Sequence, residues 1–309
     1  MDVSVVIPCL NEAGNAAAIA KAVIAELHKA EVTYEIIFID NDSSDDTVDI
    51  IKGLCAVNPN IRLIVNNQNY GQMRSPTHAI YQTSGAAVIG ICADFQDPPE
   101  MIPAFIDRWR GGAKVVLGVR QSERTSAFTR LIRAIGYGFF ARFGDYRVIP
   151  DATGFGLYDR EVVECLKRWR DPEPFFRGML VESGFGLETI AYHRPDRAAG
   201  ASKNNFGTLL NFALSGLASS SKRLLRAPLI LSLFVLPLAV TALLAAAILG
   251  LLGHNAWPLV FLSLAMLSFG MSFFFLGLIG EQVRMIAQMS RDVPLVVEKE
   301  RINFPSVRR

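Results

Sequence analysis

The chain has 309 residues and a formal net charge of +2, so no global basic field points to nucleic acid as a partner. Its mean hydropathy of +0.29 and its 51% hydrophobic content are high for a soluble enzyme. The excess is local, because residues 227–280 contain no Lys, Arg, Asp or Glu. This composition predicts a soluble domain joined to a membrane segment, and it excludes a disordered chain, a secreted miniprotein and a polytopic transporter.

The cysteines and the N-terminus indicate the compartment of the soluble part. The four cysteines do not have the spacing of metal ligands and imply no disulfide framework; they are Cys9, Cys55, Cys92 and Cys165. The first residues carry no basic region and their apolar run ends at Pro8, so we expect no cleavable signal peptide. These features predict that the N-terminal domain stays in the cytoplasm.

Strands and helices alternate through the first 190 residues. Apolar, β-branched runs predict buried strands at 3–7, 35–39, 61–65, 86–91 and 114–119. Helical patterns lie between them at about 12–29, 45–57, 74–84 and 99–110. The alternation predicts an α/β domain with a mostly parallel sheet that is covered on both faces. Ligands of such sheets bind beyond the carboxyl ends of the strands.

Acidic and amide residues follow three of the predicted strands. The clusters are Asn11-Glu12, Asp40-Asn41-Asp42, and Asp94 with Gln96 and Asp97. Asp94 and Gln96 offer carboxylate and amide oxygens, which hard cations such as Mg²⁺ or Mn²⁺ prefer. The alternative interpretation is an Asp that caps the next helix. The clusters at 8–12 and 40–45 suit a base or a ribose, but turn chemistry and capping explain each of them equally well.

The C-terminal third predicts membrane association. Residues 204–226 have an apolar helical face and end in basic residues, which favours an interfacial amphipathic helix over an ordinary core helix. The uncharged stretches 229–252 and 256–280 are each long enough to cross a bilayer. Basic residues flank this pair and are absent from the turn at 253–255, so the positive-inside rule puts both ends in the cytoplasm.

Five motifs stand in a fixed order ahead of the two uncharged stretches. They are VIPCLNE (6–12), DNDSSDDT (40–47), ADFQDPPE (93–100), GVR (118–120) and RAAGASK (197–203). In this order and spacing the chain resembles the family 2 glycosyltransferases of the polyprenyl-phosphate type, which include bactoprenol glucosyltransferases and dolichol-phosphate mannose synthases. The resemblance covers nearly the whole chain, although no single motif is specific.

The resemblance implies a GT-A, Rossmann-like fold and a role for each matching residue. The nucleotide sugar would be held by Pro8, Leu10, Asn11, Glu12, Asp40 and Asp94. Asp94 and Gln96 would hold Mg²⁺ or Mn²⁺, and the catalytic residues would be Asp94, Asp97 and Arg120. The acceptor phosphate would be bound by Arg197, Ser202 and Lys203. Arg suits this task because it binds phosphate in a bidentate manner, and Lys because it is a mobile point charge.

One departure from the family pattern bears on the acceptor. Gly154 stands where relatives often carry the Asp that is proposed as the catalytic base, and Gly156 replaces an Arg. A base is needed to deprotonate a sugar hydroxyl. A phosphate monoester has its second pKa at about 6 and is already largely dianionic at neutral pH. The missing carboxylate therefore favours a phosphate acceptor, although Asp97 or Asp151 could substitute as the base.

We expect four parts and weigh three functions. The parts are a catalytic domain at 1–200, an interfacial helix at 201–227, a two-helix transmembrane hairpin at 228–280 and a cytoplasmic tail at 281–309. The leading function is inverting transfer of one sugar from a UDP-sugar to polyprenyl (undecaprenyl) phosphate at the cytoplasmic membrane. The second is transfer to a glycan or glycolipid hydroxyl, and the third is a catalytically weak membrane scaffold. The hairpin also offers a packing surface for a homo-oligomer.

Overall fold

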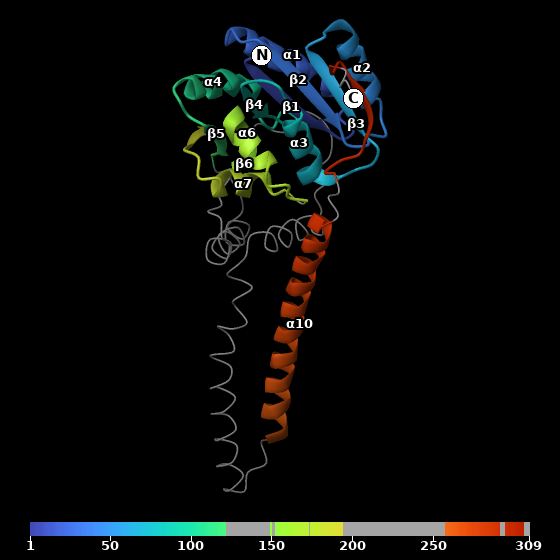
Figure 1. Cartoon of the computed structure of the whole chain (residues 1–309), viewed down its shortest axis with the longest axis vertical. Coiled ribbons are helices and arrows are strands. Elements are labelled where there is room, and N and C mark those ends of the chain that lie inside the picture. The colour runs from blue at the N-terminus through green and yellow to red at the C-terminus, as the bar shows by residue number, and fades with distance from the viewer. Residues whose placement is uncertain (122–148, 150–151, 173, 194–256, 291–293, 306–309) are drawn as a thin grey trace.

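Figure 1 shows the computed structural model of the chain, which describes residues 1–121, 149, 152–172, 174–193, 257–290 and 294–305. Its centre is an eight-stranded sheet with the order β7-β5-β6-β4-β1-β2-β3-β8. The strands are β1 (Val3–Cys9), β2 (Tyr34–Asp40), β3 (Ile61–Asn66), β4 (Ala87–Gly90), β5 (Val115–Arg120), β6 (Ala152–Asp159), β7 (Leu187–Tyr192) and β8 (Glu298–Ile302). The helices are α1 (Ala16–Lys29), α2 (Thr47–Val57), α3 (Gly71–Tyr81), η1 (Pro99–Met101), α4 (Ile102–Arg110), α6 (Arg160–Lys167), α7 (Phe176–Glu182) and α10 (Trp257–Ser290).

The strand directions make the sheet mixed. β4, β1, β2 and β3 pair in parallel, and β7 is parallel to β5. β6 runs antiparallel between β4 and β5, and β8 runs antiparallel beside β3. Six of the eight strands, β1 to β5 and β7, therefore run in one direction, which confirms the predicted mostly parallel sheet; of the described strands, only β6 and β8 run the other way. Glycines interrupt the apolar run of β6 and charges fill β8, so neither segment has the pattern of a buried parallel strand.

Helices cover both faces of the sheet, and a hydrophobic cluster fills each interface. Successive strand residues point to opposite faces, so Ile36 and Phe38 of β2 join one cluster while Ile37 and Ile39 join the other. The first cluster includes residues of α1, α2 and α4, and the second includes residues of α3, α6 and α7. Burial on both sides requires apolar residues at consecutive positions, which is why the central strands are readable from the sequence.

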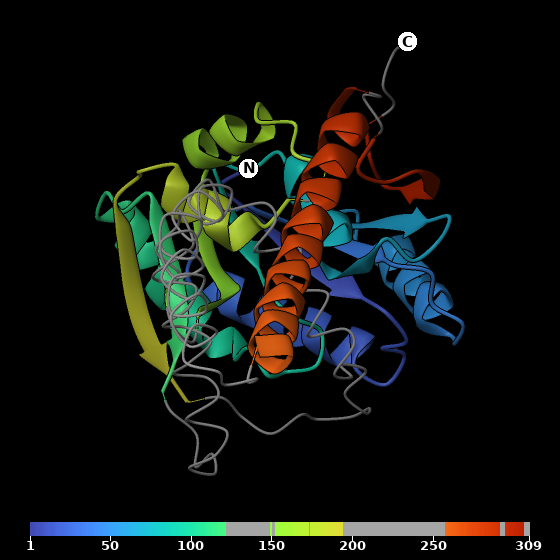
Figure 2. The same ribbon diagram turned by 90° about the horizontal axis from the view of Figure 1, so that it is seen from below.

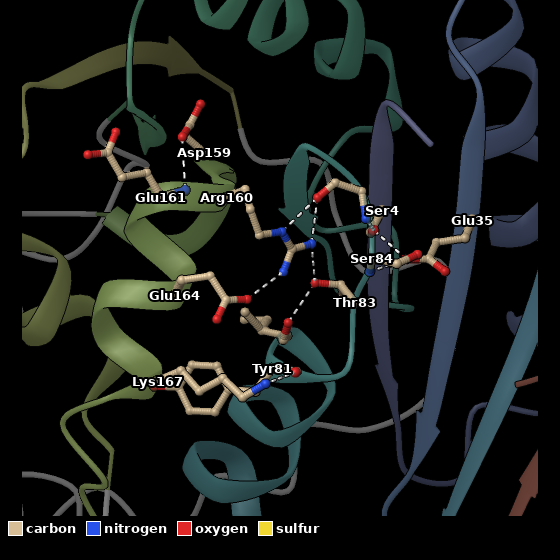
Figure 3. A network of polar contacts seen from close by, with 12 residues as sticks. Ser4, Glu35, Tyr81, Thr83, Ser84, Asp159, Arg160, Glu161, Glu164 and Lys167 are labelled. Atoms are coloured by element: carbon tan, nitrogen blue, oxygen red, sulfur yellow. Dashed lines mark hydrogen bonds and ion pairs between the residues drawn. The ribbon is translucent and has the colours of Figure 1, made fainter. Parts of the chain in front are cut away.

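A buried polar network joins the amino ends of the central strands. Glu35 is fully buried and accepts hydrogen bonds from Ser4 Oγ at 2.5 Å and from the Ser84 backbone N–H at 2.6 Å (Figure 3). Arg62 forms an ion pair with the same carboxylate. Arg160 of α6 donates to the turn that precedes β4. The network therefore fixes the strand starts at the edge of the sheet opposite the one where the strands end.

α10 projects away from the sheet domain (Figures 1 and 2). It ends at Ser290 and not at position 280, where the predicted second span ended. Glu281 and Arg284 end the apolar run but not the helix, since residues 281–290 contain no Gly or Pro. Across the described ranges, no helix has both the length and the apolar character needed to span a bilayer. The predicted interfacial helix at 201–227 and the predicted span at 229–252 lie outside the described residues.

The segment after α10 returns to the sheet domain and adds the edge strand β8. Arg74 of α3 donates from Nε to the Leu295 carbonyl at 2.9 Å, and His78 Nε2 lies 2.6 Å from Glu298 Oε1. Arg301 donates from Nε to Glu298 Oε2 at 2.7 Å. The sequence predicts a cytoplasmic tail at 281–309 and no strand within it, because EKERI is charged and has no apolar alternation. Its partners are distant in the chain and come from α3 and β3.

We expect the attachment of β8 to weaken in acid. Burial raises the pKa of the Glu298 carboxyl, but the hydrogen bonds and charges of His78 and Arg301 outweigh it and lower the pKa to about 2. The folded-state pKa lies below the ordinary value of 4.5, so the stabilisation is present above pH 4.5 and is lost as the pH falls toward 2. Replacing Glu298 with Gln should cost about 1–3 kcal/mol at neutral pH.

Denaturant titrations of the full chain at pH 7 and pH 2 measure this effect. The matched control is Glu300→Gln in the same strand, since Glu300 pairs with Lys52 at the surface. The two variants should differ in stability at pH 7, and the difference should shrink below pH 4.5 and be nearly gone at pH 2. Equal stability of both variants at pH 7 would contradict the assignment.

Candidate active site

Strands β1 and β2 end side by side, which brings their two polar clusters together. Their parallel register pairs Cys9 with Asp40. Asn11 has a left-handed backbone conformation with a φ of 56°, which Asn tolerates, and it donates its backbone N–H to Ser43 Oγ at 2.8 Å. Its side-chain oxygen accepts the Ser44 backbone N–H, also at 2.8 Å. The turns after the two strands therefore form one connected polar edge.

The other residues that the sequence assigns to a nucleotide sugar lie on this edge. Pro8 lies within β1, Leu10 and Glu12 follow it, and all three are half-buried. Asp40 is 1% exposed, and its Oδ2 accepts the Ser43 backbone N–H at 3.0 Å. Among the described residues, the buried Asp40 Oδ1 has no hydrogen-bond partner. A buried carboxylate oxygen of this kind is a ready acceptor for an N–H group of a ligand.

An amide cluster at the end of β3 extends the same edge, and the sequence analysis missed it. Asn66 Nδ2 donates to Asn41 Oδ1 at 3.0 Å, and Asn41 Nδ2 donates to Asn69 Oδ1 at 2.8 Å. The Tyr70 backbone N–H also donates to Asn41 Oδ1, at 2.9 Å. The run NNQN at 66–69 follows a predicted strand, so the carboxyl-end rule was the signal that would have found it.

The turn after β4 presents the predicted metal ligands. Asp94 and Gln96 are half-buried, and the Gln96 backbone N–H donates to Asp94 Oδ1 at 3.2 Å. Phe95 between them has a φ of 59°, which marks a tight left-handed turn. Over the part of the chain that is described, no group of three or more His, Cys, Asp or Glu side chains gathers as a metal site. One carboxylate and one amide oxygen fit a hard cation that takes its remaining ligands from phosphate and water.

Asp97 anchors this turn to β7. Its side chain is buried, Oδ2 accepts the Cys92 backbone N–H at 3.2 Å, and Oδ1 accepts the Tyr192 hydroxyl at 3.1 Å. Burial raises the pKa of the Asp97 carboxyl, although these bonds oppose the shift. Both carboxylate oxygens are engaged in the protein, so the geometry suits Asp97 to holding the turn in place. Tyr192 was not singled out by the sequence, because its distance along the chain hides the contact.

Arg120 ends β5 next to this anchor. The parallel register of β5 and β7 pairs Arg120 with Tyr192. Arg120 is half-buried, and within the described ranges its buried Nε has no hydrogen-bond partner. An unsatisfied guanidinium N–H at a strand end is a donor for an anionic ligand. The structure thus brings Asp94, Asp97 and Arg120 to the ends of β4 and β5, which lie on either side of β6.

The backbone of β6 explains why glycine stands at positions 154 and 156. Gly154 has a φ of 95°, a conformation in which a side chain would be strained. A Cβ at Gly156 would lie 2.3 Å from the Val116 carbonyl oxygen, so no larger residue fits at that position without moving β5. Asp151, the other candidate base, lies outside the described residues. The predicted phosphate-binding residues Arg197, Ser202 and Lys203 also lie outside them.

Comparison with known proteins identifies the family. The sequence model described as "Glycosyl transferase family 2" matches residues 4–167. The chain belongs to glycosyl transferase family 2. The match includes β1 to β6 and hence every described residue of the predicted site.

Curated relatives of this family 2 glycosyltransferase cover most of its length. The "Bactoprenol glucosyl transferase" of Shigella phage SfX is 34% identical over 240 residues, which are 76% of this chain and 77% of that protein. The "Uncharacterized glycosyltransferase sll0501" of Synechocystis is 31% identical over 72% of this chain and 70% of its own. The "Putative glycosyltransferase CsbB" of Bacillus subtilis is 27% identical over 98% and 93% of the two chains.

Proposed function

We propose that this family 2 glycosyltransferase moves one sugar from a UDP-sugar to polyprenyl phosphate, with inversion, at the cytoplasmic face of the membrane. The observation that carries the acceptor class is the absence of a side chain at Gly154, together with the engagement of both Asp97 oxygens within the protein. A hydroxyl acceptor needs a base at this point, whereas a phosphate acceptor arrives as an oxyanion. The name of the phage relative, bactoprenol glucosyl transferase, supports the same acceptor class.

The polar edge supplies the donor-binding groups. The buried Asp40 Oδ1 would accept an N–H of the base, and the Asn66 side chain supports that strand end through its hydrogen bond to Asn41. Asp94 and Gln96 would hold Mg²⁺ or Mn²⁺, which when bound neutralises charge on the leaving diphosphate. Arg120 would donate to a phosphate oxygen with the Nε that lacks a protein partner among the described residues.

The reaction is a single displacement that balances without a proton transfer. A phosphate oxygen of the acceptor attacks the anomeric carbon, and the bond from that carbon to the UDP oxygen breaks. UDP leaves with the electron pair, so one glycosyl–oxygen bond replaces another. The chain's own residues bind and orient the two reactants, which is the main source of rate in such a transfer.

The membrane arrangement belongs to the same proposal. The predicted hairpin at 228–280 and the interfacial helix at 201–227 would keep the sheet domain beside the lipid headgroups, with both chain ends in the cytoplasm. The uncharged run and its flanking basic residues support this arrangement. A second copy packed on the hairpin would give a homo-oligomer.

Product analysis with matched acceptors tests the function. Full-length protein in membranes receives a panel of radiolabelled UDP-sugars with Mg²⁺ or Mn²⁺, and either undecaprenyl phosphate or undecaprenol. We expect a chloroform-soluble, mild-acid-labile product only with the phosphate. Product with undecaprenol, or UDP release without a lipid product, would assign a hydroxyl acceptor. Absence of turnover with every donor would favour a scaffold.

A further inference from the structure

Arg177 of α7 covers the position where Gly154 lacks a side chain. A Cβ built at Gly154 would lie 3.7 Å from Arg177 Cγ and 3.9 Å from its Cδ. The guanidinium continues past this point, and its Nη1 donates to the Ala152 carbonyl at 2.8 Å. Its Cζ lies 5.4 Å from the centroid of the Phe175 ring, a cation–π distance. The hydrogen bond to Ala152 and the contact with Phe175 therefore hold this arginine at the start of β6.

The start of β6 lies beside the proposed transfer site. Ala152 pairs with Val119, the residue before Arg120, so the two arginines approach neighbouring backbone positions of paired strands. On the other side, β6 pairs with β4, whose last residue leads into the turn that carries Asp94 and Asp97. Arg177 thus adds positive charge close to the strand end that carries Arg120.

We propose that Arg177 binds the phosphate group of the acceptor lipid. A guanidinium does not abstract a proton, and its planar fork of N–H donors matches the oxygens of a phosphate group. A site with this side chain over Gly154 and its cation beside Ala152 therefore offers no base for a hydroxyl acceptor and suits a dianion. α7 also lies at the end of the sheet domain from which α10 projects (Figure 1), where a lipid acceptor would arrive. This inference rests on the proposed function.

Binding of farnesyl phosphate to the full-length protein in detergent tests the inference without turnover. Arg177→Gln should weaken this binding by about 10- to 100-fold, because a charge-assisted hydrogen bond is lost. Arg177→Lys keeps the charge and a donor for the Ala152 carbonyl, and should weaken binding less. The affinity for UDP should not change in either variant. Arg108→Gln, which removes an exposed arginine of α4, is the matched control and should behave as the wild type.

Four outcomes overturn or separate the claims. Unchanged farnesyl phosphate binding in both Arg177 variants would show that Arg177 only supports β6. An equal loss of UDP affinity would assign Arg177 to the donor diphosphate and overturn the acceptor assignment. If Arg177→Gln fails to fold, Arg177→Lys decides, and wild-type affinity with normal KM for undecaprenyl phosphate refutes the inference. If the wild type itself does not bind farnesyl phosphate, the proposed function fails first and the role of Arg177 fails with it.

Discussion

Replacing Asp94 with Ala should lower the rate of sugar transfer by about 10³-fold or more. Asp94 is the one carboxylate of the predicted ligand pair, and the Gln96 amide alone is a weak cation site. Asp94→Asn keeps the size of the side chain and an oxygen that accepts the Gln96 N–H. It should lose nearly as much activity, because the charge and not the shape binds the cation.

Two measurements separate this effect from misfolding. Mn²⁺ binding in the presence of UDP, followed by paramagnetic relaxation of water, should be lost in both Asp94 variants, while thermal unfolding stays at the wild-type temperature. The matched control is Asp107→Ala, an exposed aspartate of α4, which should retain both activity and Mn²⁺ binding. Wild-type turnover by Asp94→Asn would refute the metal assignment.

Replacing Glu35 with Ala should destabilise the fold by about 3–5 kcal/mol. The substitution removes the acceptor of the Ser84 N–H and of the Ser4 hydroxyl (Figure 3). It also removes the carboxylate that pairs with Arg62, whose side chain is only 13% exposed. An unpaired, largely buried charge costs far more than a broken surface pair. The turn at 83–85 packs too tightly against β1 to rearrange around the lost carboxylate, since a Cβ at Gly85 would lie 2.7 Å from the Ser4 backbone nitrogen.

The free energy of unfolding of the full chain, from denaturant titration, is the measurement. Glu188→Ala is the matched control, because Glu188 also lies in a strand and pairs with Arg108 at the surface. That control should change stability by less than about 1 kcal/mol. The folded fraction of Glu35→Ala should keep its affinity for UDP, since the network lies at the sheet edge opposite the site. Equal losses for Glu35→Ala and Glu188→Ala would show that the buried network adds nothing.

The central strands were predictable because their signal is local. Burial on both faces of β1 and β2 demands consecutive apolar residues, and EIIFI and VSVVI display them directly. β7 carries the mixed run LETIAY and is exposed at several positions. β8 is charged, and its pairing with β3 depends on a partner far away in the chain. Periodicity within a short window does not contain such information.

The candidate site likewise contains some contacts that follow from the sequence and others that only the fold reveals. Asp94 and Gln96 are two residues apart at a strand end, so their proximity follows from the sequence. The contacts of Asp97 with Tyr192 and of Gly154 with Arg177 depend on the placement of β6 and β7 in the sheet. The sequence showed that a carboxylate is missing at Gly154, but only the fold shows that the Arg177 side chain lies over it.

The return of the chain to β3 through β8 has a consequence for biosynthesis. A ribosome releases β8 only after α10 has been made, so β3 waits with a free edge while the rest of the chain is translated. Unpaired strand edges recruit other strands, which makes this interval prone to aggregation. If residues 1–200 were expressed alone, β8 would be missing and the edge of β3 would stay unpaired. A fragment meant for crystallisation should therefore carry residues 294–305 on a short linker, so that the edge can close.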